Sequence, residues 1–312
     1  MNNVTAILCA DLHLRDDQPI CRKDDFFKAM IRKMNWLRCL QHELQCPIIC
    51  AGDIFDKWKG SPFLLSQVLR WFPDNVIAIP GQHDLPNHDI NAINKSSLYV
   101  LHRAKRISLF KKYSNDEMRI ASNAGSENYS TVKVFGFPFG MEIKKFPIIR
   151  CTRSVAMCHT LVCQSKDRLM MKLGAVDSKA LLRKLDNIDL IVTGDNHKPF
   201  IERLDGRLLV NCGSMMRIEA DQVDYKPCVY LWDRNKNEVE AVSIPIEEGV
   251  VSRDHLKTNA KELFEHQLEV YIERLKKKVE IGLSFEKNLT KFFVENSTVM
   301  GVKKLIRKAM EE

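Results

Sequence analysis

The sequence lacks any apolar run long enough to cross a lipid bilayer, so we expect no helical membrane span. It also lacks a basic leader and a small-residue cleavage site, because residues 4–10 run directly into a charged cluster, and we expect a protein that is not secreted. The ten cysteines include no Cys-x-x-Cys pair, and six of them lie in apolar strand or helix patterns. This argues against a disulfide scaffold and for buried, reduced thiols in the cytoplasm. The six are Cys9, Cys39, Cys50, Cys158, Cys212 and Cys228.

A large surplus of one charge is also missing. The formal net charge is +8, from 48 basic and 40 acidic residues, which makes an anionic partner plausible but supports nucleic acid only weakly. Proline is absent after Pro245, where apolar residues recur at helical spacing among many charges. With 312 residues, 45% of them hydrophobic, the chain can bury one large core and carry a small additional module. We place the main domain at residues 1–248 and a helical module at 249–312.

The first part of the sequence alternates apolar runs with amphipathic segments. Strands are predicted at residues 4–10, 47–51 and 76–80, with helices between them in residues 24–44 and 62–72. This order predicts parallel strands joined by right-handed crossovers.

The second part shows the same alternation with shorter connections. Residues 200–246 change to short strands with tight polar turns, which predicts antiparallel hairpins and a second sheet. The predicted fold is therefore α/β, with two stacked mixed β-sheets flanked by helices and a C-terminal helical module. The remaining predictions are strands at 107–110, 132–137, 155–158 and 190–193, a helix at 178–185 and a surface loop at 114–130.

Five polar clusters follow predicted buried strands. Strand ends form the active-site crevice of open α/β sheets, so clusters that are far apart in sequence can converge there. Seven of their residues, three Asp, one amide and three His, form a set that fits two divalent cations sharing a bridging carboxylate. The clusters are Asp11-Leu12-His13, Gly52-Asp53, Gly81-Gln82-His83-Asp84, His159 and Gly194-Asp195-Asn196-His197.

In this order the clusters resemble the motif series of the calcineurin-like metallophosphoesterases, over roughly residues 4–245. The resemblance implies that family's four-layer sandwich, with two sheets between helical layers. Residues 52–56, 81–84 and 213–217 look most like the SbcD-type DNA repair exonucleases and their phage relatives. That branch implies a nuclease subunit of a recombination, repair or replication complex, in a bacterial or phage-infected cell.

The resemblance also implies a role for each motif residue. Asp11, His13, Asp53 and His197 would hold one metal ion, and Asp53, Gln82, His159 and Asp195 the other, with Asp53 as the bridge. His83 would be the catalytic histidine, acting on the developing charge or on the leaving 3′ oxygen, and Asp84 would orient its ring.

Two motif positions differ from the commonest pattern of the family. Gln82 stands where many members have Asn, and Asp195 stands where the motif usually has His. A hard carboxylate in place of an imidazole favours Mn²⁺ or Mg²⁺ over Zn²⁺ or Ni²⁺. We therefore predict two divalent cations, with Mn²⁺ preferred and Mg²⁺ possible.

Several residues near these motifs are candidates for DNA contact. Just past the metal motif, the cations Lys57 and Lys59 flank the aromatic ring of Trp58. Such a group can hold a phosphate backbone and stack a base. His88 and Arg217 are further candidates, although Arg217 can equally pair with an acidic neighbour. Asp56 fits a residue that orients its neighbours better than a metal ligand.

Three functions remain open from the sequence. The first is a metal-dependent DNA exonuclease or endonuclease, for which the resemblance implies a coiled-coil SMC-like ATPase partner at the helical module and a homodimer through residues 63–72 or 87–99. The second is a phosphatase or cyclic-nucleotide phosphodiesterase with a non-DNA substrate. The third is a weakly active, DNA-binding scaffold subunit. The complete ligand set and His83 argue against the third, and the 213–217 motif, the basic surplus and the helical tail favour the first.

Overall fold

The structure is a computed structural model of the whole chain, and it describes residues 4–111, 117–118, 132–145 and 153–253. The chain divides into two compact units, Met1–Ser252 and Arg253–Glu312. The helical module expected at 249–312 lies, from residue 254 on, outside the described residues. The architecture below is that of the first unit.

The first sheet contains the three strands predicted at the start of the chain. Its order is β14-β13-β1-β2-β3-β4, with β1 to β4 mutually parallel and with β13 and β14 antiparallel at one edge. These strands are short and almost wholly buried near the centre, as continuous apolar runs predict for parallel strands covered on both faces. They are β1 (Ala6–Cys9), β2 (Ile48–Cys50), β3 (Val76–Ala78), β4 (Ile107–Leu109), β13 (Cys228–Asp233) and β14 (Glu238–Ser243).

The second sheet is built around four parallel strands, β6, β7, β10 and β12. Its order is β11-β12-β10-β7-β6-β5, and its two outermost pairs, β11–β12 and β6–β5, are antiparallel. A separate small sheet pairs β8 (Val162–Cys163) with β9 (Val176–Asp177). The second-sheet strands are β5 (Glu117–Met118), β6 (Val132–Phe137), β7 (Arg153–His159), β10 (Leu190–Gly194), β11 (Phe200–Leu204) and β12 (Arg207–Asn211).

The predicted fold class is confirmed, with one correction to its assembly. The hairpins of residues 200–246 do not make a second sheet of their own, because β11–β12 joins β10 and β13–β14 joins β1. Each hairpin thus covers an edge that would otherwise expose unpaired backbone groups. The loop predicted at 114–130 also needs correction, since Glu117–Met118 pairs with β6; its other residues lie outside the described ones.

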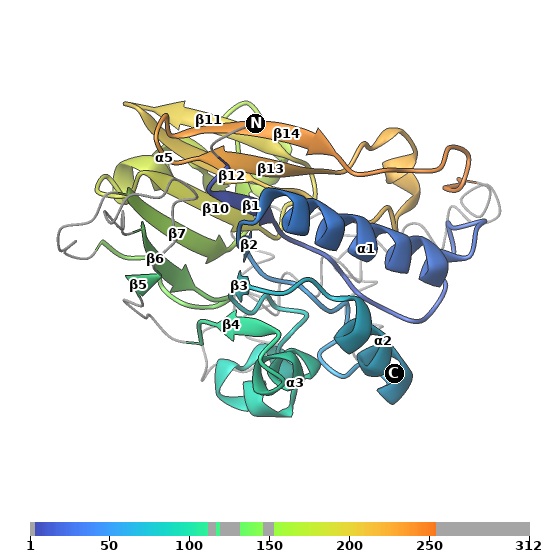
Figure 1. Cartoon of the computed structure of the whole chain (residues 1–312). Helices are drawn as coiled ribbons and strands as arrows, with labels where there is room; N and C mark the ends of the chain where they lie inside the picture. Colours follow the sequence, from blue (N-terminus) through green and yellow to red (C-terminus); the bar gives the residue numbers. More distant parts are fainter. Residues whose placement is uncertain (1–3, 112–116, 119–131, 146–152, 254–312) are drawn as a thin grey trace, which may run out of the picture. The chain divides into compact units, whose positions relative to one another are not determined.

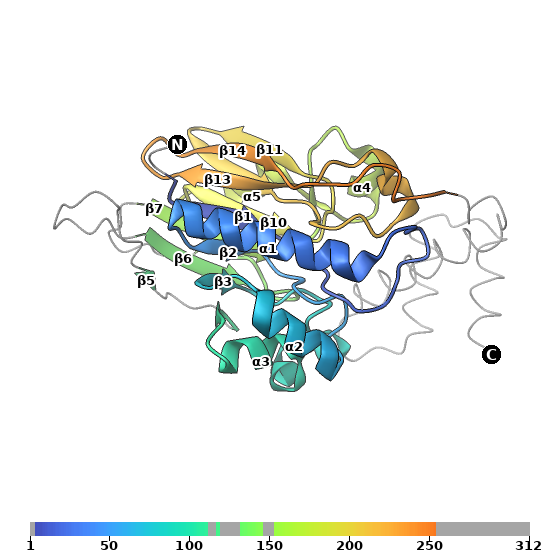
Figure 2. The same ribbon diagram turned by 45° about the vertical axis from the view of Figure 1, so that its right-hand side comes forward.

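Helices cover the outer faces of the sheets (Figures 1 and 2). α1 (Phe26–Leu44) and α2 (Pro62–Trp71) pack on the first sheet together with α3 (Ser97–Arg103), and α5 (Ser178–Lys184) packs on the second. Asp25 caps α1 by accepting the Lys28 N–H at 3.0 Å, and Ser61 caps α2, whose first residue is proline. The short helix α4 (Arg168–Lys172) and the 3₁₀ turns Pro86–His88, Ile90–Lys95 and Ala220–Asp224 complete the connections.

Three apolar clusters hold the four layers together. One joins α1 and α2 to the first sheet, where Met30, Met34 and Leu37 face inward at helical spacing. The second fills the space between the sheets and includes the fully buried Trp232, and the third joins the second sheet to α5. Because both sheets are buried on both faces, the rigid ends of their strands are fixed relative to each other.

Most described cysteines are buried and none is in a disulfide, which agrees with the expected reduced thiols. Cys228 is half-buried, and Cys39 is exposed because it lies on the face of α1 opposite Met34 and Leu37. Within the described residues, no helix combines the length and the apolar character needed to cross a membrane.

Candidate metal centre

The polar clusters at the strand ends come together where β1, β2, β7 and β10 end. Backbone hydrogen bonds connect the turns: the Asp11 N–H donates to the Gly52 carbonyl at 3.0 Å, and the His13 N–H donates to the Asp53 carbonyl at 3.1 Å. Three overlapping groups of ligand atoms each lie within 4.8 Å of one another: Asp11, His13 and His197; His13, Asp53 and His83; and Asp11, Asp53 and His159.

The backbone at these ligands is in a conformation that L-residues seldom adopt. The φ angles are 50° at Asp11, 45° at His13, 51° at Asp53 and 78° at Asp195. Each such non-glycine residue costs on the order of 1–3 kcal/mol and persists only where the surrounding fold enforces it. The strained turns direct side chains from the strand ends towards one point, as expected for a functional site.

Two glycines of the motifs make room for the ligands. A Cβ atom at Gly81 would lie 2.1 Å from Asp53 Oδ1, and one at Gly52 would lie 2.4 Å from His159 Nδ1. Gly52 also has a φ of +99°, which L side chains rarely adopt. The motif glycines are therefore required by close approach to the site.

Two imidazoles meet Asp11 on one side of the centre. The Nε2 atoms of His13 and His197 lie 3.1 Å apart. Burial, and then the neighbouring His13, lowers the pKa of His197 to about 3, so its ring is neutral and keeps a lone pair for a cation. Burial raises the pKa of the fully enclosed Asp11 carboxyl well above its usual range.

His159 and Asp53 form the other side. His159 Nδ1 donates its proton to the Ala51 carbonyl at 2.6 Å, which leaves Nε2 facing Asp53 Oδ2 at 3.2 Å. Burial opposes charge on both groups, but their mutual attraction outweighs it. The attraction to Asp53 raises the pKa of His159 to about 10. The attraction to His159, together with His83 and His13, lowers the pKa of Asp53. A histidine fixed by a carbonyl on one nitrogen is the usual arrangement of a metal ligand.

Gln82 and Asp195 meet beside this pair. Gln82 Nε2 donates to Asp195 Oδ1 at 2.6 Å, and the Asp195 N–H donates to both carboxylate oxygens of Asp11 at 3.1 Å. The two unusual motif residues therefore lie in contact with each other. Among the described residues Asp195 belongs to none of the close ligand groups, which contain five of the predicted ligands, namely Asp11, His13, Asp53, His159 and His197.

Unpartnered polar atoms test whether these residues fit a metal. His13 Nδ1, Asp53 Oδ2, Gln82 Oε1 and His159 Nε2 are buried without a well-formed hydrogen bond. His13 Nδ1 lies 3.5 Å from Asp56 Oδ1, and Asp53 Oδ2 and His159 Nε2 face each other at 3.2 Å as an ion pair. A buried polar atom without a hydrogen bond costs about 1–3 kcal/mol, and such a concentration of them favours a bound ligand. Lone pairs on nitrogen and oxygen are what a divalent cation binds, so the donor set fits the predicted metal ions.

His83 is held at the edge of the centre. Its Nδ1 donates to the Asp56 carbonyl at 2.7 Å, and its ring lies edge-on to that of His13 with centroids 4.9 Å apart. Asp56 also pairs through its side chain with His13 and with Arg15, at 3.5 and 3.2 Å. Asp56 thus orients its neighbours, the role predicted for it.

Asp84 has a different set of contacts from the one expected. Its buried carboxylate accepts the backbone N–H groups of Ile54, Phe55 and Gly81 at 3.2, 2.9 and 3.0 Å. Burial, and then the neighbouring Asp53, raises the pKa of Asp84 to about 7. It holds the turns after β2 and β3 together, while the described contact that orients the His83 ring comes from the Asp56 carbonyl.

Comparison with known families agrees with this geometry. The family model described as calcineurin-like phosphoesterase superfamily domain matches residues 5–232. The chain belongs to this superfamily. It is therefore a phosphoester hydrolase of the metallophosphoesterase type, and the sequence resemblance is confirmed at that level.

Two solved structures show a weaker likeness. One, described as a novel archaeal phosphodiesterase, has 13% identity and a TM-score of 0.37 over 76% of this chain and 98% of its own. The other, described as a 5′-nucleotidase from Staphylococcus aureus, has 14% identity and a TM-score of 0.44 over 85% of this chain and 59% of its own. No curated protein matches the sequence. Likeness at this level does not identify a substrate.

A groove opens beside the metal centre of this phosphoesterase. It encloses about 380 Å³, and its walls include Gln82 and His83 together with Lys57, Trp58, Lys59 and His88. His88 is held there by a hydrogen bond between its Nδ1 and the Gln82 carbonyl, at 3.1 Å. Four of the five residues predicted to contact DNA therefore line one hollow together with His83.

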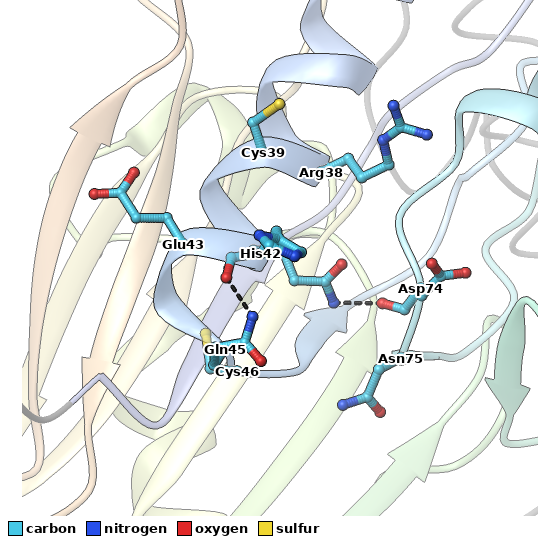
Figure 3. A pocket seen from close by; sticks show the side chains of 9 residues that line it. Arg38, Cys39, His42, Glu43, Gln45, Cys46, Asp74 and Asn75 are labelled. Atoms are coloured by element: carbon cyan, nitrogen blue, oxygen red, sulfur yellow. Dashed lines mark hydrogen bonds between the residues drawn. The ribbon is translucent and has the colours of Figure 1, made fainter. Parts of the chain in front are cut away.

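A larger hollow of about 790 Å³ lies elsewhere, at the C-terminal end of α1 (Figure 3). Its walls include Cys39, His42 and Glu43 of the helix and Asp74 and Asn75 before β3, and none of the predicted ligands. It lies at the opposite end of the first-sheet strands from the polar clusters. Size alone therefore does not locate the active site of this phosphoesterase.

Arg217, the fifth residue predicted to contact DNA, is not brought to the groove. It is buried, and its guanidinium donates to the carbonyls of Val223 and Glu247 at 3.1 and 2.6 Å. Arg15, which the sequence reasoning did not select, does reach the site by pairing with Asp56. Arg15 could have been found from the sequence by its position four residues after Asp11, on the same turn as His13.

Proposed function

We propose that this phosphoesterase hydrolyses phosphodiester bonds of DNA, as a repair or recombination nuclease of the SbcD type. The observation that carries the proposal is the groove in which Lys57, Lys59 and Trp58 adjoin His83 and Gln82. Cations that track a backbone and an aromatic ring that stacks a base are the usual means of binding a nucleic acid strand. A small phosphate ester would need neither.

The residues of the site have separable tasks in this proposal. Divalent cations, when bound, supply a hydroxide nucleophile and polarise the phosphate oxygens. Asp11, His13, His197, Asp53, His159 and Gln82 hold them, and Asp195 positions the Gln82 amide through its 2.6 Å hydrogen bond. His83 has its Nδ1 on the Asp56 carbonyl, and its Nε2 would donate a proton to the leaving 3′ oxygen.

Mn²⁺ is the expected metal. Gln82 offers its unpartnered carbonyl oxygen, and Asp195 adds a carboxylate beside it, so this half of the centre is rich in hard oxygen donors. Apo-protein supplied with Mn²⁺ should therefore recover more hydrolysis than apo-protein supplied with Zn²⁺, in a metal titration with a chromogenic phosphodiester. Full recovery with Zn²⁺ and none with Mn²⁺ would show that the ligand argument is mistaken.

The DNA substrate is tested by comparing two esters under the same conditions. With Mn²⁺, the protein should cleave end-labelled DNA, and Trp58→Ala should lower that cleavage about tenfold or more, since stacking contributes roughly 1–3 kcal/mol per base. The same variant should leave hydrolysis of p-nitrophenyl phosphate within about twofold of the wild-type rate, because that ester does not extend along the groove. Both rates are measured on one preparation.

Trp71→Ala is the matched control. Trp71 is at the end of α2, packs against Arg70 of the same helix and Arg38 of α1, and does not line the groove. It should leave both reactions unchanged. Hydrolysis of the small ester without any cleavage of DNA would favour a phosphatase instead.

The proposal includes partners of the same branch. A coiled-coil SMC-like ATPase would bind the segment 249–312, and a homodimer would form through residues 63–72 or 87–99. Phe63 in the first of these segments is 55% exposed, an unusual state for a large apolar side chain.

A further inference from the structure

A third, smaller hollow lies between α1 and residues 245–247. It encloses about 290 Å³. Ala29, Arg32, Lys33 and Trp36 line it from one face of α1, since they are spaced by three and four residues. None of the predicted metal ligands and none of the groove residues around His83 lines it.

The walls of this pocket carry an excess of positive charge. Arg22, Arg32, Lys33 and Arg217 supply four cations, and Asp24 and Glu247 supply two carboxylates. Arg22 is neutralised by a two-pronged pair with Asp24, at 2.7 and 2.6 Å, and Arg32 pairs with Glu247 at 2.6 Å. Lys33 and Arg217 have no carboxylate partner among the contacts described, so two positive charges remain uncompensated.

Both uncompensated cations are buried. Lys33 is 6% exposed and Arg217 is 4% exposed. Lys33 Nζ makes one described hydrogen bond, to the Met215 carbonyl at 2.9 Å, and can donate two more. Both terminal nitrogens of Arg217 donate hydrogen bonds to backbone carbonyls, while its Nε is buried without a hydrogen-bond partner. Lys33 Nζ and Arg217 Nε therefore keep N–H donors for which no protein acceptor is described.

Such a cluster is unfavourable without an anion. Burial, and then the neighbouring Arg22 and Arg217, lowers the pKa of Lys33 to about 7. Removing like charges from water next to one another costs several kcal/mol unless a counter-charge joins them. A phosphate monoester carries about −1.5 to −2 charges at pH 7 and three acceptor oxygens, which matches two cations and their free donors.

We propose that the pocket between α1 and residues 245–247 binds the phosphate group of a small anion, inorganic phosphate or a nucleoside monophosphate. Lys33 and the Nε of Arg217 would donate to the phosphate oxygens, with Arg32 at the rim. Trp36 lines the same pocket and gives a base a surface on which to stack. This site is separate from the metal centre and does not depend on DNA being the substrate.

Calorimetric titration of the full chain tests the site, with EDTA present to keep metal ions from binding phosphate at the other centre. Inorganic phosphate and dAMP are titrated separately. Lys33→Met should weaken binding of both by about ten- to a hundredfold, because a hydrogen bond to a charged group contributes roughly 1.5–3 kcal/mol. Tighter binding of dAMP than of phosphate would identify a nucleotide and assign a role to Trp36; equal binding would identify phosphate alone.

Lys28→Met is the matched control, since Lys28 is on the same helix, exposed, and outside the pocket. It should bind both ligands as the wild type does. Arg32→Met covers the case in which Lys33→Met does not fold, because the Arg32 side chain is 55% exposed, and it should weaken binding several-fold.

Three results would overturn the proposal. They are no binding by the wild-type protein at millimolar ligand, equal binding by wild type, Lys33→Met and Arg32→Met, or a loss of binding in His83→Ala with Lys33→Met unaffected. The last result would locate the anion in the groove.

Discussion

Replacing Asp53 with Asn should lower phosphodiester hydrolysis about a thousandfold or more. Asp53 is fully buried and belongs to two of the three ligand groups, as Asp11 also does, and the family resemblance predicts that Asp53 is the bridging carboxylate. Metal polarisation of the phosphate contributes several kcal/mol, and each ~1.4 kcal/mol changes the rate tenfold. The rate is measured with saturating Mn²⁺ on a chromogenic phosphodiester, and bound metal is measured by elemental analysis.

The fold should survive this change. Asn has nearly the same shape as Asp. Its side-chain oxygen can still accept the backbone N–H of His83, which in the wild type donates to Asp53 Oδ1 at 2.8 Å. Asp186→Asn, at a half-exposed aspartate that pairs with Lys145, is the control and should retain both metal and activity. An Asp53→Asn protein that keeps its metal content and its full rate would refute the assignment of Asp53 as a bridge.

Replacing His83 with Ala should lower kcat by about 10²–10⁴ while both metal ions remain bound. Proton transfer by a positioned side chain contributes this much, and the other ligands do not depend on the His83 ring. Activity and metal stoichiometry are measured on the same sample. His42→Ala, at an exposed position near the C-terminal end of α1, should change neither.

The two readouts separate acid catalysis from metal binding. His83 lies close enough to Asp53 and His13 to act as a ligand itself. Loss of one metal ion in His83→Ala would therefore contradict its assignment as the catalytic acid, and undiminished hydrolysis would exclude it from the reaction.

Local pattern predicted the elements that carry the site. The strands around Ile7, Ile49 and Ile77 are buried on both faces, and such strands appear in sequence as unbroken apolar runs. α1 was predicted for a related reason, because Met30, Met34 and Leu37 repeat at helical spacing. Both signals arise within a few residues, so they need no knowledge of the rest of the chain.

Pairing over long distances was not predictable in the same way. β13 and β14 show the alternation of an antiparallel hairpin, but nothing local indicates that β13 pairs with β1, more than 200 residues earlier. The hydrogen bond between Gln82 and Asp195 spans 113 residues and was missed for the same reason. A pattern within a strand specifies its faces, whereas its neighbour is selected by the packing of the complete core.

Arg217 shows the same division at the level of one side chain. Its position in the 213–217 motif suggested a phosphate contact at the metal centre, but the fold turns it towards α1, where it joins Lys33 and Arg22 in another pocket. Its chemistry as an anion-binding group is a property of the residue. Which anion site it serves depends on the direction of its loop.

The sequence by itself determined the superfamily of this phosphoesterase, the types of its predicted ligands and their order at the ends of strands, and it predicted a catalytic role for His83. These are local properties, because a motif is made of neighbouring residues and the period of an apolar run. Only the tertiary structure decided which ligands meet, that the Asp56 carbonyl holds the His83 ring and that Lys33 and Arg217 line the same pocket. Such contacts join residues far apart in the chain, and they exist only after the two sheets have packed together.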